Sequence, residues 1–335
     1  MNQRAVIATT HIDHHSMIIT KEALDAIAEQ INCGHRPLLT VEHDLTIPPF
    51  GKTVKAWVQP RNDGEYELVV ENEIFDQILW AELTDGTRLF KQESETDRHP
   101  FADRYEDQTA DAFLSYDWMN FDSEENIKSF IEDIRNQSDL EFSAHEFGRK
   151  SYIPDPEFLI GIAKAVGVYL IAKNILNKTG DKVSDLASED IAKFYTFVKS
   201  FISSAVKYAR PKNRPITYVF VIRNKPTVEF IARSTNADLV ISAVSPEKLD
   251  AILAETNFIY STFEPAKVQY LLNTEGKWKF NYLQTNIGAV IGTEESLSRR
   301  IERIEVLRQR QAMDEAEAEQ NNTSLPTENL PRESE

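Results

Sequence analysis

Three segments near the start of the chain have the pattern of β-strands, and in residues 52–59 hydrophobic and polar positions alternate with a two-residue period. These segments are residues 5–10, 52–59 and 65–71. Asn62-Asp63-Gly64 lies between the last two segments and is a typical hairpin turn sequence. The pattern therefore predicts antiparallel strands in the N-terminal part of the chain.

A helical period begins directly after Thr20, whose hydroxyl can cap a first turn. The apolar positions of residues 21–32 share one helix face: Leu24, Ile27, Ala28 and Ile31. Residues 76–83 and 126–136 are also predicted to be helical. Residues 140–147 return to alternation and predict another strand.

Beyond Pro154 and Pro156 the apolar positions follow long helical periods. Two long helices are expected there, over residues 157–177 and 188–209. A shorter helix is expected over residues 245–255, and a last one from about residue 294. The intervening segments predict strands over residues 217–223, 227–233, 239–243, 268–272 and 277–283.

These elements predict an α+β fold with two domains. Residues 1–153 are expected to form a mostly antiparallel β domain with flanking helices, and residues 154–312 two long helices packed on a small sheet. Residues 93–125 hold eleven acidic and two basic side chains with several aromatic ones, which indicates an irregular insertion that docks through its aromatics. Residues 313–335 hold seven acidic side chains and one basic one, and predict a disordered acidic tail.

Charge and cysteine content narrow the function classes. The chain of 335 residues has 37 basic and 54 acidic side chains, for a net charge of −17. That charge disfavours a general nucleic-acid binder, because a polyanion is repelled unless positive charge gathers locally. Cys33 is the single cysteine, which excludes a disulfide framework within the chain and a cysteine-rich zinc site.

The sequence was also searched for targeting signals and for motifs that bind cofactors. The N-terminus lacks the pattern of a signal peptide, and Lys164 and Lys173 interrupt the apolar stretch 158–176. We therefore expect a cytoplasmic protein. The sequence has no phosphate-binding loop, dinucleotide-binding glycine motif, zinc-protease motif or nucleophile-elbow motif. No cofactor is expected.

One histidine-rich segment has ligands that zinc or manganese can use. It comprises His11, Asp13, His14 and His15. The Asp-His-His triplet also occurs in metal-dependent phosphoesterases, but the further aspartates which that chemistry needs are not found in the sequence. The alternative, exposed histidines at a turn between a strand and a helix, is therefore favoured.

Three short motifs follow one another in the first domain. His43-Asp44 ends an apolar strand, Pro49-Phe50-Gly51-Lys52 forms a turn, and Asp63-Gly64 turns a hairpin. This order resembles the N-terminal half of phage prohead maturation proteases and related scaffold-type serine proteases. The resemblance implies a phage, mobile-element or bacterial origin and a protease-like first domain. The family's serine lies on a later strand, which matches Ser143 within residues 140–147.

A serine hydroxyl becomes a nucleophile only with a base in hydrogen-bond reach, which itself has to be oriented. On an alternating strand, Ser143 shares one face with Glu141 and His145. The opposite face is expected to pack into the core through Leu140, Phe142 and Ala144. The candidate catalytic set is Ser143 as nucleophile, His43 as base, and Glu141, Asp44 or His145 as orienting residue. Alternatively, these polar residues have no catalytic role and form the solvent-exposed face of a half-buried strand.

A basic segment contrasts with the acidic chain. Residues 191–228 hold eight basic and no acidic side chains, most densely at Lys207, Arg210, Lys212 and Arg214. Such a segment can bind nucleic acid or an anionic membrane. It can equally dock on acidic parts of the same chain or on a protein partner, and cations at a helix C-terminus are favoured without any ligand.

Three functions follow from these features. The first is a protein-interaction or assembly factor on a protease-like domain, which docks a protein partner or a second copy through the aromatic insertion and the helix pair. The second is an active serine endopeptidase that cleaves itself or an assembly partner. The third is a binder of nucleic acid or anionic membrane through residues 207–214.

Overall fold

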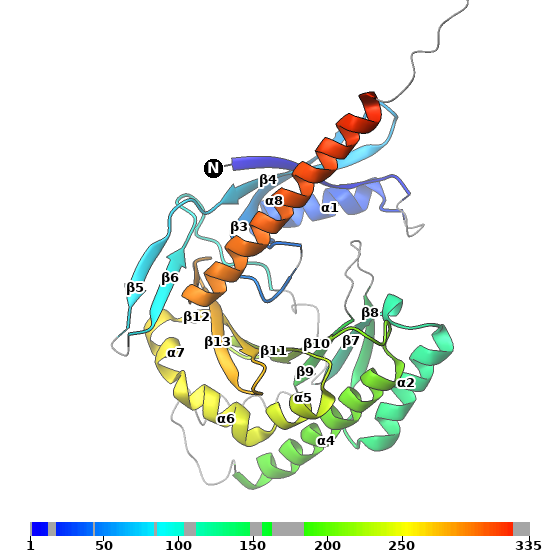
Figure 1. Ribbon diagram of the computed structural model, residues 1–335, viewed down its shortest axis with the longest axis vertical. Coiled ribbons are helices and arrows are strands. Elements are labelled where there is room, and N and C mark those ends of the chain that lie inside the picture. Colours follow the sequence, from blue (N-terminus) through cyan, green and yellow to red (C-terminus); the bar gives the residue numbers. More distant parts are fainter. Residues whose placement is uncertain are drawn as a thin grey trace, which may run out of the picture.

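The computed structural model describes residues 2–12, 18–42, 44–83, 86–103, 112–147, 156–162 and 184–323. The fold is α+β, as the sequence predicts, with a small antiparallel sheet and a large mixed sheet (Figure 1). The small sheet has the strand order β1-β4-β3-β2: β1 Asn2–Thr9, β2 Leu38–Leu39, β3 Gly51–Pro60 and β4 Tyr66–Ile74. The strands β1, β3 and β4 correspond to the three strand segments predicted from the sequence.

Helix α1 (Lys21–Asn32) covers one face of the small sheet. The Thr20 hydroxyl accepts a hydrogen bond from the Ala23 N–H at 3.2 Å, so the predicted cap is confirmed. Leu24, Ala28 and Ile31 are buried against three residues of the sheet: Ala56, Leu68 and Val70. The small sheet and α1 thus share one apolar cluster.

The large sheet has the order β5-β6-β14-β13-β12-β11-β10-β9-β7-β8, with parallel pairing in β7–β8, β9–β10 and β11–β12. Its strands take residues from both sides of Pro156, so the expected boundary at 153/154 runs through this sheet. The bounds are β5 Leu79–Glu82, β6 Arg88–Gln92, β7 Phe113–Asp117, β8 Ser143–Phe147, β9 Glu157–Ile162, β10 Ile216–Ile222, β11 Thr227–Ser234, β12 Pro265–Leu272, β13 Trp278–Thr285 and β14 Val290–Thr293.

One face of the large sheet is covered by helices. They are α2 Glu124–Gln137, α4 Ser184–Tyr208, α5 Ala237–Ala243, α6 Pro246–Glu255 and α7 Asn257–Phe263. Alternate strand residues meet them in the main core, where Phe130, Phe158 and Phe201 pack edge to face or tilted with ring centres 5.5–6.0 Å apart. A short 3-10 helix, η1 (Trp118–Asn120), leads from β7 towards α2.

The opposite face meets the last helix, α8 (Glu294–Thr323), and the loop 44–50. Arg300 is buried and donates hydrogen bonds to the carbonyls of Pro48 and Pro49 and to the side chain of Gln92. Burial lowers the pKa of the Arg300 guanidinium to about 10. Arg303 pairs with Glu42, so α8 joins the large sheet to the loop between β2 and β3 of the small sheet (Figure 1).

The structure corrects four secondary-structure predictions. Residues 157–162, expected to start a long helix, form strand β9, and residues 239–243 belong to helix α5 rather than to a strand. Residues 79–82 form strand β5 instead of a helix. Residues 313–323, expected to be disordered, continue α8. The rest of the expected helix 157–177 lies outside the described residues.

The acidic segment 93–125 places most of its described aromatic side chains inside the fold. Four of its aromatic residues are buried: Phe101, Phe113, Tyr116 and Phe121. Residues 113–117 form β7, whose two neighbours in the sheet are β8 and β9. Trp118 and Met119 are exposed, and Tyr105 lies outside the described residues. The aromatic residues of this segment therefore mainly build the core.

No helix in the described part of the chain combines the length and the apolar character that crossing a membrane requires.

Candidate functional site

Ser143 and His145 lie two residues apart on β8, at the edge of the large sheet. The Nε2 atom of His145 is 2.8 Å from the Oγ atom of Ser143, which is hydrogen-bond distance. Ser143 is half-buried and His145 is exposed. The opposite face packs against the core as predicted, through Leu140, Phe142 and Ala144. A serine and a histidine are thus in contact at an accessible strand edge.

The other members of the candidate catalytic set are placed differently. Glu141 is exposed and precedes β8. The Asp44 carboxylate accepts hydrogen bonds from the N–H and the hydroxyl of Thr46, at 2.9 and 2.7 Å, and so closes its own turn. His43 lies outside the described residues. Leu45 packs over the same sheet face as Ser143, so the loop that follows His43 is on the side of the candidate serine.

The turn Pro49-Phe50-Gly51-Lys52 has a structural role here. A side chain at Gly51 would overlap the carbonyl of Glu73, which explains the glycine. Lys52 is fully buried, and its ammonium lies 2.8 Å from the Asp97 carboxylate. Arg36 pairs with the other oxygen of that carboxylate at 2.8 Å. The motif therefore anchors the segment around residue 97 to the small sheet.

The histidine-rich segment is only partly described. His11 lies 3.2 Å from a carboxylate oxygen of Asp63, in the hairpin turn, and both side chains are largely exposed. Asp13, His14 and His15 lie outside the described residues. Within the described ranges, no group of three or more histidine, cysteine, aspartate or glutamate side chains is arranged to hold a metal ion.

The C-terminal end of α4 and the turn after it carry the four cations singled out in the sequence: Lys207, Arg210, Lys212 and Arg214. Lys207 pairs with Asp133 at 2.7 Å, and hydrogen bonds to Asp133 and Tyr208 raise the pKa of Lys207 to about 12. Arg210 pairs with Asp122 at 2.8 Å, and Lys212 donates to the Val206 carbonyl at 2.7 Å. These contacts correspond to docking within the chain, one of the alternatives left open by the sequence.

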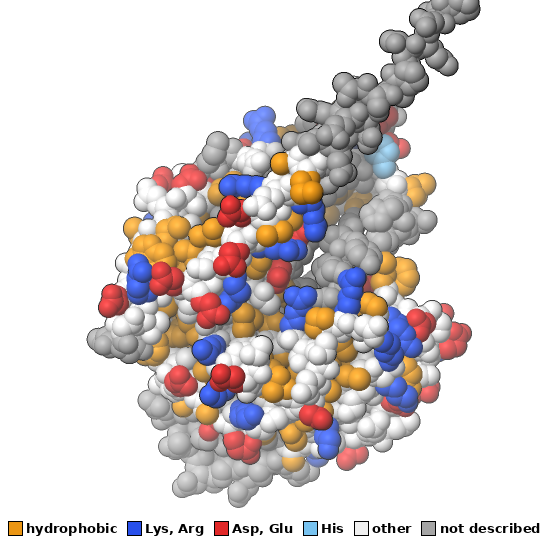
Figure 2. Space-filling view, viewed as in Figure 1, with side chains coloured by type: hydrophobic (Ala, Val, Ile, Leu, Met, Phe, Trp, Pro, Cys, Tyr) orange, Lys and Arg blue, Asp and Glu red, His pale blue; other side chains and the backbone are white. Residues whose placement is uncertain are grey.

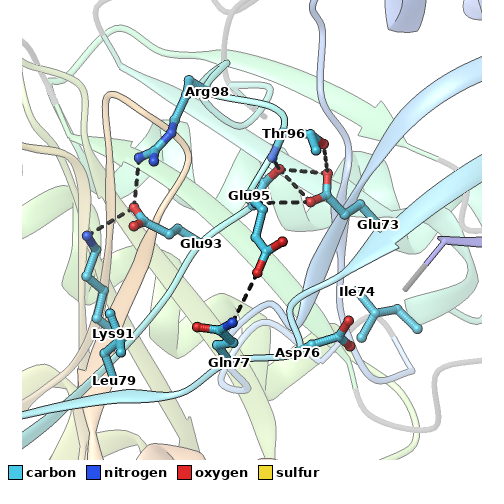
Figure 3. Close-up of a pocket in the computed structure, with 11 residues that line it drawn as sticks. Glu73, Ile74, Asp76, Gln77, Leu79, Lys91, Glu93, Glu95, Thr96 and Arg98 are labelled. Carbon is cyan, nitrogen blue, oxygen red and sulfur yellow. Dashed lines mark hydrogen bonds and ion pairs between the residues drawn. The ribbon is translucent and has the colours of Figure 1, made fainter.

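A cavity of about 420 Å³ opens between β4, β6 and the segments that follow them (Figure 3). Acidic side chains dominate its lining, yet they have partners. Glu93 lies 3.0 Å from Lys91 and 3.1 Å from Arg98, and buried Glu73 accepts a hydrogen bond from Ser94 at 2.6 Å. These carboxylates therefore already have hydrogen-bond or ion-pair partners within the chain, although acidic residues still outnumber basic ones in the lining.

A row of polar side chains, buried in the middle and half-buried at both ends, crosses the large sheet on the face opposite to α4. Gln269 donates to Glu229 at 2.8 Å, and Asn281 donates to Gln269 at 2.7 Å. Arg299 of α8 donates to Asn281 at 2.6 Å, and the Lys267 ammonium lies 3.2 Å from Glu229. We call these five residues the polar seam. Such a row is unusual inside a sheet, where apolar residues dominate.

The polar seam holds the loop 44–46 on the sheet. Gln269 donates to the Leu45 carbonyl at 3.0 Å, and Asn281 donates to the Thr46 carbonyl at 2.9 Å. Sequence reasoning missed the seam because its members are spread over residues 229–299. The sequence does contain one signal for the seam. In the apolar stretches 227–231 and 267–271, a polar residue stands in the middle of each predicted strand: Glu229 and Gln269.

Strand β5 forms the other edge of the large sheet, and all four of its residues are exposed. Leu79 and Trp80 expose 54% and 43% of their surface. A mainly apolar groove of about 400 Å³ adjoins the strand and is lined by residues such as Ala81, Leu89, Phe263 and Ile291. The hydrophobic side chains on the left of Figure 2 lie over the hairpin of β5 and β6. This edge is an apolar surface with an adjoining groove.

No model of a protein family, no curated protein and no solved structure matches the chain.

Proposed function

We propose that the protein is a protein-interaction factor that binds an extended segment of a partner protein along β5. The observation that carries this proposal is the exposure of all four residues of an edge strand, two of them large and apolar. Edge strands are usually protected by charges, proline, bulges or covering loops, because their free N–H and C=O groups pair with other chains. Within the described residues, β5 has a strand neighbour on one side only.

The groove beside β5 adds a means of selection. A strand added to a sheet edge gains affinity from main-chain hydrogen bonds and selectivity from pockets that take alternate side chains. The groove lined by Ala81, Leu89 and Phe263 is mainly apolar, and exposed Ile287 stands at its margin. The favoured partner segment is therefore extended and carries apolar side chains at alternate positions.

The edge proposal predicts a loss of peptide binding in a β5 variant. Extended peptides selected from a displayed random library on the native protein are expected to bind the double variant Leu79→Lys, Trp80→Lys at least about tenfold more weakly. Isothermal titration calorimetry measures this ratio. Val206→Lys, at an exposed apolar position of α4, is the matched control and should bind like the native protein. Equal binding to the native protein and the double variant would contradict the proposal.

Sedimentation of the protein without peptide tests for self-pairing. A dimer that the same double variant abolishes would replace the partner protein with a second copy of this chain at β5. If the protein is a monomer at all concentrations, self-pairing is excluded, and the peptide titration decides whether β5 binds a partner segment.

A second candidate function, the serine endopeptidase, is favoured by the contact between Ser143 and His145. A nucleophile within hydrogen-bond reach of a base is the first geometric requirement of such an enzyme. The resemblance of the His43–Lys52 region to phage prohead proteases supports the same proposal. In this mechanism Ser143 attacks the carbonyl carbon of the peptide bond. The proton of the serine hydroxyl passes to His145, or to His43 as the sequence predicts.

A fluorophosphonate probe tests the second candidate. If Ser143 is activated, intact-mass spectrometry is expected to show one added probe mass on the native protein and none on Ser143→Ala. His145→Gln should slow labelling at least about a hundredfold, the usual contribution of a general base. Ser138→Ala, just after α2, is the control and should label like the native protein. Equal labelling of the native protein and Ser143→Ala, or no labelling of either, would remove Ser143 from consideration.

A further inference from the structure

A second cavity, of about 510 Å³, lies between the N-terminal segment and the strand ends of the large sheet. Leu38, Phe101 and Tyr282 supply apolar and aromatic wall, and Lys225, Lys267 and Gln284 supply polar groups. Its volume falls in the range of small-molecule sites, which typically combine apolar walls with a few placed polar groups. Ser143 does not line this cavity, and Asn286 stands between the cavity and the β5 groove, because it lines both.

Gln284 provides the observation that points to a ligand. The residue is only 4% exposed, and its Nε2 atom has no hydrogen-bond partner among the described residues. Buried amide groups are normally paired, because an unmade hydrogen bond is costly. Gln284 lines the cavity, so a bound molecule that accepts a hydrogen bond could satisfy this amide after a small rotation of the side chain.

Charge favours an anionic ligand. The Lys267 ammonium lies 3.2 Å from Glu229 and has further N–H groups to donate. Lys225 is exposed at the cavity, and His35 also lines it. Among the described lining residues, Asp103 is the acidic one. The aromatic and aliphatic wall suits a flat, apolar body, while the ammonium groups suit an anionic group attached to it.

We propose that this cavity binds a small organic anion with a flat, mainly apolar body, held by Lys225, Lys267 and Gln284. The site is independent of the proposed interaction along β5. Because Lys267 also belongs to the polar seam, an occupant would touch the same network that holds the loop 44–46 on the sheet.

The experiment uses two fluorescent dyes that share a ring system. 8-Anilinonaphthalene-1-sulfonate carries the anionic group, and N-phenyl-1-naphthylamine lacks it. Titration of the full chain is expected to show one site at which the sulfonate binds at least about fivefold more tightly than the neutral dye. Lys225→Gln and Gln284→Leu should each weaken the sulfonate about fivefold or more, and Lys225→Gln should leave the neutral dye unchanged.

Two further variants locate the site. Leu38→Trp should fill the cavity and abolish binding of both dyes, whereas Lys199→Gln, exposed on α4, should change neither. Circular dichroism and thermal melting establish that each variant is folded. The proposal is overturned if the two dyes bind equally, if the cavity variants leave sulfonate binding unchanged, or if Leu79→Lys, Trp80→Lys removes it instead.

Discussion

Replacing Lys52 with methionine is expected to lower the free energy of unfolding by about 3–5 kcal/mol, because it leaves a buried carboxylate short of a partner. The ammonium lies 2.8 Å from the Asp97 carboxylate and donates to the carbonyls of Asp97 and His99 at 2.6 and 3.1 Å. Methionine fills similar space but supplies none of these hydrogen bonds. The Asp97 carboxylate would then keep Arg36 and His99 as partners but lose the buried ammonium.

Urea unfolding followed by tryptophan fluorescence measures this loss. Lys55→Met is the matched control, because Lys55 is exposed on the same strand, and its loss should stay below about 0.5 kcal/mol. If Lys52→Met costs less than about 1 kcal/mol, the buried ion pairs do not stabilise this part of the fold as argued.

The same ion pairs give a pH dependence with a definite sign. Burial acts to raise the pKa of Asp97, but hydrogen bonds from Lys52 and Arg36 hold it well below its usual range. A carboxylate whose pKa is depressed in the folded state contributes stability above its unfolded pKa of about 4, and loses it as the pH falls further. Asp97→Asn should therefore show a flatter loss of stability below about pH 4 than the native protein.

Replacing Gly161 with alanine is expected to cost about 3 kcal/mol of stability, because there is no room for a methyl group. Gly161 lies on β9 directly opposite Phe113 of β7, and an added Cβ would overlap the phenyl ring. The ring is fully buried in a cluster with Leu159 and Val219, so it cannot move towards solvent. Chemical denaturation measures the loss.

A double-mutant cycle separates this clash from a general effect of alanine in the strand. In the background of Phe113→Leu, the substitution Gly161→Ala should cost at least about 1 kcal/mol less than in the native protein. An unchanged cost in both backgrounds would show that the ring is not the cause.

Local sequence patterns predicted the secondary structure correctly where an element has one apolar and one polar face. Helix α1 has one apolar face and a capping threonine, and the hairpin of β3 and β4 has alternation with an Asn-Asp-Gly turn. In such amphipathic elements the period of the apolar residues is visible in the sequence. The prediction of an α+β fold followed from these elements.

Local patterns failed where an element is apolar on both faces. Residues 158–162 form a fully apolar run, and the period of such a run cannot separate a buried strand from a buried helix. Within this run, Gly161 makes room for the ring of Phe113 on the neighbouring strand. Residues 239–243 contain β-branched residues, yet the capping side chain of Asn236 starts a helix there.

The candidate sites also differ in whether they depend on local sequence or on the order of the strands. The contact between Ser143 and His145 is local, and the two-residue period of a strand placed them on one face. The polar seam and the Gln284 cavity depend on which strands become neighbours in the sheet. Strand order is a property of the whole chain, which hydrophobic periodicity does not contain.

The contacts of the loop 44–50 set an order for assembly during synthesis. Its carbonyl groups are bound by Gln269, Asn281 and Arg300, at sequence separations of 224, 235 and 252 residues. Contacts of such separation cannot form until the later partner has been made, and they slow folding because a long loop has to close first. The small sheet therefore emerges from the ribosome long before its docking surface exists, and α8, which is translated after the strands of both sheets, joins it to the large sheet.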